Sequence, residues 1–293
     1  MLQQIRDLYY QAYVGLPRKV WYLSLILLIN RSGTMVIPFL TVFLTTKQGY
    51  TAAEASWVMV AFGSGGIVGN YVGGLLNDRF GSWHIQAGSL FGSAIIFFLL
   101  ARVEHYLLFC LLIFFLSVIA DAFRPANRAA VATYTPKDRL TKAFGLQRMA
   151  VNLGFSIGPL AGGIILTYFD YEMLFWADGL TCLFSGIAFL LLIPIDETAR
   201  PQRAVISEDP SLLDAPQVIK PSSAGHLQAW LMTLCVANVL VAMCFFQLFS
   251  TAPVYLEKLG YQELQIGYLF TLSGLLIVVF EMPLLHLAEG RYV

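Results

Sequence analysis

Long apolar runs recur along the chain and are separated by polar segments. A helix of about 20 apolar residues crosses the roughly 30 Å hydrocarbon core of a bilayer, because each residue adds about 1.5 Å. Eight runs reach this length, and they cover residues 20–45, 55–77, 84–101, 106–124, 143–169, 174–195, 227–256 and 265–287. The pattern predicts an all-α membrane protein with eight transmembrane helices.

Glycine is frequent inside these runs, as in residues 62–74, FGSGGIVGNYVGG, and residues 154–163, GFSIGPLAGG. Small residues at helical spacing allow helix backbones to approach closely in lipid. A strand of a membrane barrel would instead be about ten residues long, with alternating apolar and polar positions. The runs therefore favour a packed helical bundle.

The composition agrees with a membrane protein, with 58% hydrophobic residues, 12% charged residues and a mean hydropathy of +0.70. The formal net charge is zero, so the overall charge does not point to nucleic acid. All four cysteines lie in apolar runs, and we expect them to be reduced and packed. No residue spacing predicts a metal site or a nucleophile–base pair, so we expect neither a cofactor nor an enzyme.

One polar segment is far longer than the others. Residues 196–226 contain four prolines, several serines and charges of both signs, which is typical of a linker. This linker divides the chain into a six-helix bundle over residues 1–195 and the two helices of a partial second bundle over residues 227–293. Two bundles joined in this way are typical of secondary transporters.

Basic residues are distributed unequally between the two sides of the predicted membrane. With a cytoplasmic N-terminus, fourteen of the 18 Lys and Arg residues face the cytoplasm, and only Lys47, Arg102 and Lys258 face the other side. Cytoplasmic loops carry the excess of Lys and Arg in membrane proteins. We therefore expect a multi-pass protein of the plasma membrane, the inner membrane in a bacterium, with a cytoplasmic N-terminus.

The loop between the second and third runs contains a short motif. Gly74, Asp78, Arg79 and Gly81 stand in the segment GLLNDRFG. This resembles the loop signature of the major facilitator superfamily, in which the loop is a latch between two helical bundles and the aspartate faces the positive end of a helix. The resemblance implies gating roles for Asp78 and Arg79, although uncharged residues follow the last glycine where the family usually has basic ones.

The fifth run contains a second motif, with the pattern GxxxGPxxGG. Its residues are Gly154, Gly158, Pro159, Gly162 and Gly163. Proline removes a backbone donor and bends a helix, while glycines on one face permit a close, dry contact. The segment resembles the fifth-helix signature of proton-coupled antiporters in the same superfamily, where it seals the contact between bundles against proton leak. General glycine-mediated packing is the alternative interpretation.

Ionisable side chains inside lipid are costly unless they are paired or hydrated, so each marks a candidate site. Arg31 lies near the middle of the first run, beside Asn30, and both are candidates for substrate or proton coupling. We expect Arg31 to face a central aqueous cavity and to bind an anionic group, either on a substrate or on Asp121. A fixed structural ion pair between Arg31 and Asp121 is the alternative.

Further ionisable residues lie in the later runs. Asp121, Arg124 and Arg128 are placed at helical spacing at the predicted end of the fourth run, so they share one helix face. A carboxylate at Asp121 is a candidate for titration in response to substrate. Glu281 in the eighth run is a further candidate for substrate or proton coupling, and Asp178 in the sixth run is a weaker one.

The resemblance implies a secondary transporter that exports a small amphipathic compound or drug in exchange for protons, by alternating access. Proton-coupled uptake of a small anionic solute or peptide is one alternative. The family has twelve spans and this chain has eight, so a truncated membrane protein that does not transport is another. The expected partners are a small-molecule substrate, protons and the lipid bilayer, without nucleic acid, and the protein is expected to be monomeric.

Overall fold

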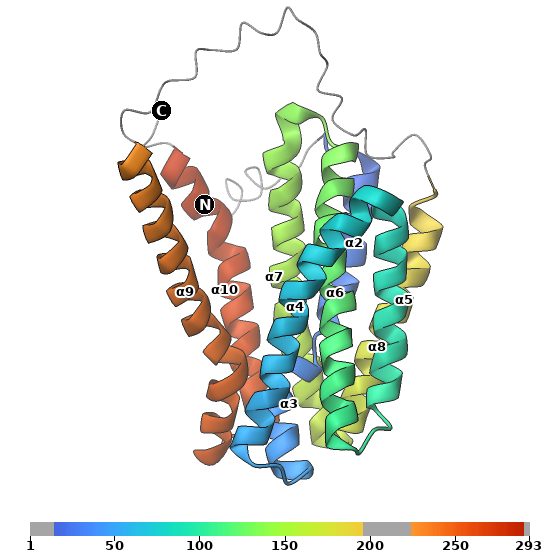
Figure 1. Ribbon diagram of the computed structural model, residues 1–293, viewed down its shortest axis with the longest axis vertical. Coiled ribbons are helices and arrows are strands. Elements are labelled where there is room, and N and C mark those ends of the chain that lie inside the picture. Colours follow the sequence, from blue (N-terminus) through green and yellow to red (C-terminus); the bar gives the residue numbers. More distant parts are fainter. Residues whose placement is uncertain (1–14, 196–223, 290–293) are drawn as a thin grey trace, which may run out of the picture.

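The computed structural model describes residues 15–195 and 224–289, and in the last two helices it places side chains over residues 230–248 and 251–280. Every regular element within these residues is helical. Eight helical segments are long and apolar enough to cross a membrane (Figure 1). This confirms the predicted all-α membrane fold and its number of apolar helices.

The first span consists of three pieces, α2 (Arg18–Ser32), α3 (Val36–Val42) and the π-helical η1 (Phe43–Lys47). The other spans are α4 (Ala52–Phe80), α5 (Ser82–Leu100), α6 (Tyr106–Tyr134), α7 (Leu140–Tyr168), α8 (Glu172–Leu192), α9 (Ala224–Lys258) and α10 (Glu263–Glu289). A short 3-10 turn, η2 (Lys137–Arg139), precedes α7.

The first span is interrupted between α2 and α3, where the sequence predicted one continuous helix. The carboxylate of Asp178, on α8, accepts hydrogen bonds from the backbone N–H of Met35, at 3.0 and 3.2 Å, and of Val36, at 3.0 Å. N–H groups at a helix start have no partner within their own helix. Because Asp178 is fully buried, its carboxylate stabilises this internal helix start away from solvent.

The helix α6 continues ten residues beyond Arg124, where the sequence predicted the end of the fourth span. The extension passes through Pro125, and residues such as Ala126 and Ala130 are buried at helical spacing within it. Burial of this apolar stripe offsets the backbone hydrogen bond that Pro125 removes. As a result, Asp121 lies inside a long helix and not at its end.

Helices α4 and α6 approach each other closely along a row of glycines. Gly65, Gly69 and Gly73 face the backbone of α6, and a methyl group at Gly73 would lie only 2.5 Å from Cα of Ala122. Backbone contacts this close need small residues, and they replace the hydrophobic driving force that is absent between helices in lipid. The glycine-rich run of the second span therefore packs as its spacing predicted.

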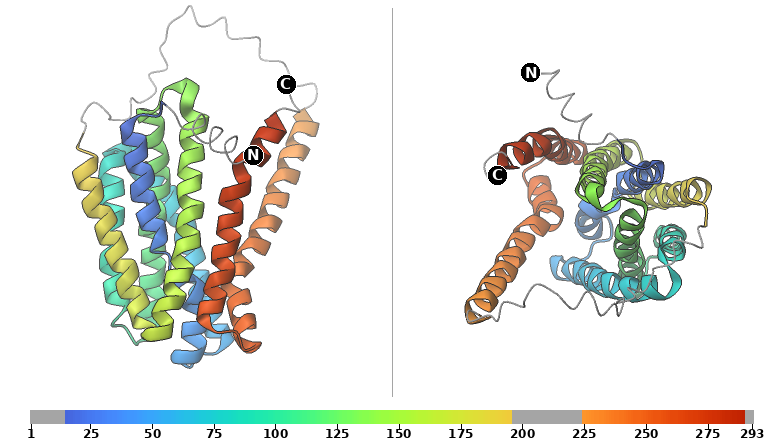
Figure 2. Two further views of the ribbon diagram at one scale, coloured as in Figure 1. Left: turned by 180° about the vertical axis from the view of Figure 1, so that it is seen from behind. Right: turned by 90° about the horizontal axis from the view of Figure 1, so that it is seen from above.

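Helices α9 and α10 stand beside the other six spans, and they approach them near the end that holds α3 (Figures 1 and 2). There α10 packs on α7, where Oγ1 of Thr271 donates a hydrogen bond to the carbonyl of Ser156 at 2.7 Å. Toward the opposite end, both helices diverge from α7. The side chains of α9 over residues 230–248 are all exposed, and their apolar character suits contact with lipid.

Candidate functional site: a polar cavity inside the helical bundle

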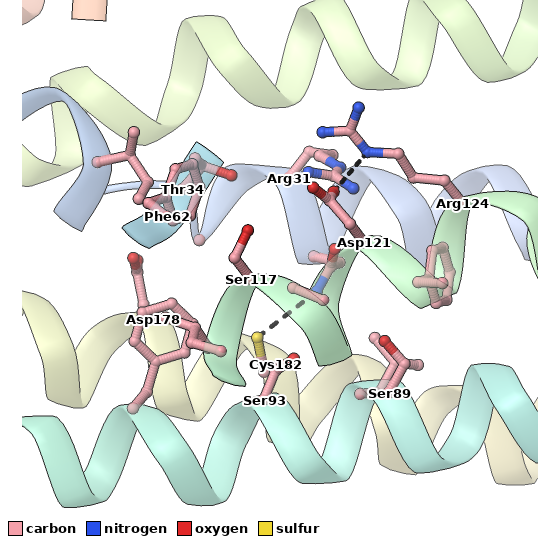
Figure 3. Close-up of a pocket in the computed structure, with 18 residues that line it drawn as sticks. Arg31, Thr34, Phe62, Ser89, Ser93, Ser117, Asp121, Arg124, Asp178 and Cys182 are labelled. Carbon is pink, nitrogen blue, oxygen red and sulfur yellow. Dashed lines mark hydrogen bonds and ion pairs between the residues drawn. The ribbon is translucent and has the colours of Figure 1, made fainter. Parts of the chain in front are cut away.

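A cavity of about 90 Å³ lies among α2, α4, α5, α6 and α8 (Figure 3). A volume of this size holds a few water molecules or a small polar group. Polar side chains on its wall come from four of these helices and from the α2–α3 connection: Asn30, Arg31, Thr34, Ser89, Ser93, Ser117, Asp121, Arg124, Asp178 and Cys182. Apolar residues such as Ile37, Phe62 and Phe97 complete the wall.

Asp121 and Arg124 form an ion pair across one turn of α6, with Nε to Oδ1 at 2.7 Å (Figure 3). The side chain of Asp121 is only 16% exposed, whereas that of Arg124 is 49% exposed. Gly66 of α4 leaves room for the carboxylate, because a methyl group there would lie 2.5 Å from Oδ2 of Asp121. The pair therefore joins the mostly buried carboxylate of Asp121 on the cavity wall to the more exposed guanidinium of Arg124.

Arg31 lies in the last turn of α2, next to the interruption of the first span. Its side chain lines the cavity together with Asp121 and Arg124, as the sequence predicted for a cavity-facing arginine. Among the described residues, however, the ion pair of Asp121 is with Arg124 and not with Arg31. The structure thus brings the three charged residues together, with Asp121 in an ion pair with Arg124 and in longer-range attraction to Arg31.

Several cavity residues were not predicted as site residues. One is Cys182, whose Sγ contacts the amide of the predicted candidate Asn30 at 3.5 Å, and another is Ser89, whose hydroxyl donates to the carbonyl of Ile119 at 2.5 Å. The hydroxyl of Ser117 is buried, and no described residue accepts from it or donates to it. Serines spaced four apart on an apolar helix, as on α5, are the signal that would have found part of this wall.

Two candidate residues do not take part in the described cavity. Arg128 is exposed on α6 and does not line it. Arg128 lies about two helical turns after Asp121, so the two residues share roughly one face of α6, but Arg128 lies beyond the cavity. Glu281 lies outside the residues whose side chains the structure describes. Over the described residues, no group of His, Cys, Asp and Glu has the arrangement of a metal site.

Where the sequence predicted a loop, Gly74, Asp78 and Arg79 of the motif lie in the last turns of α4, and Gly81 follows the end of this helix. Gly81 adopts a positive φ of 83°, a conformation that suits glycine in a tight turn. Asp78 and Arg79 are exposed, and Arg79 lies over the ring of Phe80. Gly74, the first glycine of the motif, has open space beside it, and Gly73 one residue earlier makes the contact with α6.

The glycines of the α7 motif pack on two different neighbours. Gly154 and Gly158 face the end of α2 and the interruption, and a methyl group at Gly154 would collide with the side chain of Arg31. Gly162 faces Phe39, whereas Gly163 faces the start of α10, where a methyl group would lie 2.9 Å from Cα of Leu264. The motif thus lies between the first span and α10. The carbonyl of Pro159 also faces α10, beside Gly267.

Apolar helices around a cavity that has ionisable side chains on its wall are typical of a multi-pass membrane transporter. Residues 23–292 match the Major Facilitator Superfamily, and the chain belongs to this family. The family is the one that the loop motif and the α7 motif resemble.

The chain is similar to three curated relatives that are named as a transporter, an efflux pump and an antiporter. The chain is 25% identical over 281 residues to the uncharacterized MFS-type transporter YqjV of Bacillus subtilis. The matched region covers 92% of this chain and 64% of YqjV. It is 30% identical over 128 residues to the multi-drug resistance efflux pump PmrA of Streptococcus pneumoniae, over 42% of this chain and 32% of PmrA. It is 21% identical over 253 residues to a Na(+), Li(+), K(+)/H(+) antiporter of Planococcus maritimus, over 78% of this chain and 55% of the antiporter. The chain spans less than two thirds of the length of each of these relatives.

Among solved structures, the chain resembles tetrameric PepTSo2 with a TM-score of 0.52 and 18% identity, over 62% of this chain and 44% of that chain. At this identity the likeness concerns the fold alone.

Proposed function

We propose that the protein exports a small amphipathic compound in exchange for protons, by alternating access in a plasma membrane. The observation that carries this proposal is the Asp121–Arg124 ion pair on the wall of an intramembrane cavity. Ionisable pairs at this depth are costly and are retained at substrate and proton pathways. The likeness to an efflux pump and to a cation/proton antiporter gives further support.

In this mechanism Asp121 exchanges its proton as the protein alternates between two states. A proton that reaches Asp121 neutralises the carboxylate and releases Arg124, so the charge on the cavity wall changes. Arg124 is then free to pair elsewhere or to face water through its exposed side. A change of charge of this kind biases a two-state protein through the different contacts that each state offers.

The separation of α10 from α7 at one end supports alternating access. With the N-terminus in the cytoplasm, as the distribution of basic residues predicts, the separated end faces the cytoplasm and the contacts near α3 lie at the outer surface. We propose that residues 1–195 and 227–293 belong to two bundles joined by the cytoplasmic linker 196–226. Within this arrangement, Asp78 and Arg79 act as the latch and the α7 motif seals the contact with α10. We also propose that the protein acts as a monomer.

Proton-coupled uptake of a small anionic solute is the second candidate, and Arg31 favours it because it lines the cavity and makes no ion pair among the described residues. Everted membrane vesicles with an acidic interior separate the two candidates. An exporter moves added substrate inward and releases protons, so a fluorescent indicator reports a loss of the pH gradient. A symporter needs its substrate inside the vesicle and does not respond to external addition. If none of a panel of amphipathic compounds collapses the gradient beyond vesicles without the protein, the exporter proposal is wrong.

A further inference from the structure

The guanidinium of Arg31 has an unusual environment for a charge inside a bundle. It lines the cavity, and among the described residues it has no hydrogen-bond or ion-pair partner. Arg31 is partly buried, so its guanidinium has lost part of its hydration without gaining a contacting partner among the described residues. A charge in such a place is therefore expected to meet an anionic group that occupies the cavity.

The acidic side chains on the cavity wall are already engaged. Asp121 pairs with Arg124 at 2.7 Å. Asp178 accepts the backbone N–H groups of Met35 and Val36 with both of its oxygens. Neither carboxylate is within ion-pair distance of Arg31. Asp121 attracts the guanidinium over a longer distance, so neither of these carboxylates contacts it directly.

A second observation points to a ligand at the same place. Ser117 lies one helical turn before Asp121 on α6 and is 1% exposed, yet its hydroxyl has no partner among the described residues. Buried hydroxyls are nearly always hydrogen-bonded, to protein or to something that occupies the adjacent space. Figure 3 shows Arg31, Ser117 and Asp121 around one space. A guanidinium and a free hydroxyl together form a donor set that suits an anion.

We infer that the cavity contains a subsite for a single anionic group, which accepts hydrogen bonds from Arg31 and Ser117. The apolar wall beside it, with Phe62 and Ile37, suits a carboxylate that is attached to an apolar body. The anionic group is either the carboxylate of the transported compound or a free small anion such as chloride. The subsite rests on the cavity alone and does not require proton-coupled export.

The two sources have different consequences for coupling. An anion beside Asp121 is repelled by the ionised carboxylate, so anion binding and proton binding at Asp121 favour each other. A transported anion at this subsite would therefore travel in the same direction as the proton, which is the uptake candidate. A resident inorganic anion would neutralise Arg31 and leave the exchange of substrate against protons unchanged.

The test is the thermal unfolding of the purified protein in detergent, with a bulky sulfonate buffer as the background anion and with added benzoate or chloride as probes. A ligand that binds the folded state raises the unfolding temperature in a saturable way. We expect the unfolding temperature to rise to a plateau with at least one of the two anions. Saturation with benzoate assigns the subsite to a carboxylate compound, and saturation with chloride alone assigns it to a small inorganic anion.

Variants show whether the effect belongs to this subsite. Arg31→Gln should weaken the apparent affinity by about thirtyfold or more, because a charged partner is lost. Ser117→Ala should weaken it by about fivefold, the effect of one neutral hydrogen bond. Arg128→Gln, which removes an exposed arginine outside the cavity, should bind as the unmodified protein does.

Two further variants keep the result decisive. If Arg31→Gln does not fold, Arg31→Lys retains the positive charge and should bind more weakly but measurably. Asp121→Asn removes the repelling charge and should bind at least as tightly, even though the proposed function requires it to lose proton coupling. The subsite is contradicted if neither anion shifts the unfolding temperature, or if Arg31→Gln and Arg128→Gln respond equally.

Discussion

The hydroxyl of Tyr171 donates a hydrogen bond to the carboxylate of Glu263 at 3.1 Å, and this bond joins the first six spans to α10. The ring of Tyr171 packs against Phe43, with 5.5 Å between the ring centroids. Burial, together with the nearby charge of Glu263, raises the pKa of Tyr171 above its usual range, so the hydroxyl remains a donor at physiological pH. The bond lies at the end where α10 touches the bundle, and it helps to hold that end closed.

Tyr171→Phe removes this hydroxyl and keeps the ring in place. The loss of one hydrogen bond of about 1 kcal/mol corresponds to about a fivefold change in the equilibrium between closed and open ends. We expect faster hydrogen exchange of the backbone amides in the first turns of α10, around residues 266–271, by about that factor. Mass spectrometry of the exchanged protein measures it.

A matched control lies at the same end of the molecule. Lys47 and Asp170 form an ion pair at 3.1 Å, with both side chains at least half exposed and both within the first six spans. Exposed pairs of this kind contribute little. Asp170→Asn should leave the exchange of α10 unchanged. Equal exchange in Tyr171→Phe and the unmodified protein would show that the Tyr171–Glu263 bond does not hold this end.

Asp178→Ala should destabilise the protein, because it leaves the buried N–H groups of Met35 and Val36 without an acceptor. Each unsatisfied group costs about 1–3 kcal/mol. We expect a clearly lower unfolding temperature in detergent and a reduced amount of protein in the membrane. Asp178→Asn keeps one acceptor oxygen, so its unfolding temperature should lie between those of Asp178→Ala and the unmodified protein. An unfolding temperature equal to that of the unmodified protein would mean that Asp178 does not stabilise the start of α3.

Gly154→Ala places a methyl group against the side chain and backbone of Arg31. Overpacking of this kind costs about 1–3 kcal/mol, and here it also displaces a cavity residue. We expect a lower unfolding temperature and impaired transport. Gly88→Ala on α5 is the control, since open space surrounds that position, and it should be neutral or slightly stabilising because alanine favours helix. Identical behaviour of the two variants would argue against the close packing of α7 on the first span.

The eight spans were predictable from the sequence because the length of an apolar run is set by the thickness of the bilayer. The interruption of the first span was not. It depends on Asp178, a residue 143 positions away from Met35 along the chain, and no local pattern around Met35 reveals such a partner. The end of α6 was also misplaced, because Pro125 is a local helix-breaking signal that tertiary burial overrides.

The charged part of the cavity was predictable for a similar reason, since Arg31 and Asp121 stand out inside apolar runs. Ser117 and Cys182 did not stand out, because small, uncharged side chains barely change the hydropathy of a helix. The pairing of Asp121 with Arg124 instead of Arg31 depends on side-chain geometry that the sequence does not encode locally. The residue types thus indicated which charged residues lie on the cavity wall. The hydrogen bonds and ion pairs among them follow only from the fold.

The central claim, that Asp121 couples proton movement to transport, is tested most directly by Asp121→Asn in everted vesicles with an acidic interior. In the unmodified protein, a transported compound should release protons and collapse the pH gradient. Asp121→Asn should reduce this release to the background of vesicles without the protein, at an equal amount of protein in the membrane. Asp138→Asn, which alters an exposed carboxylate beside Arg139, should behave as the unmodified protein does. Proton release by Asp121→Asn at the unmodified rate would contradict the assignment.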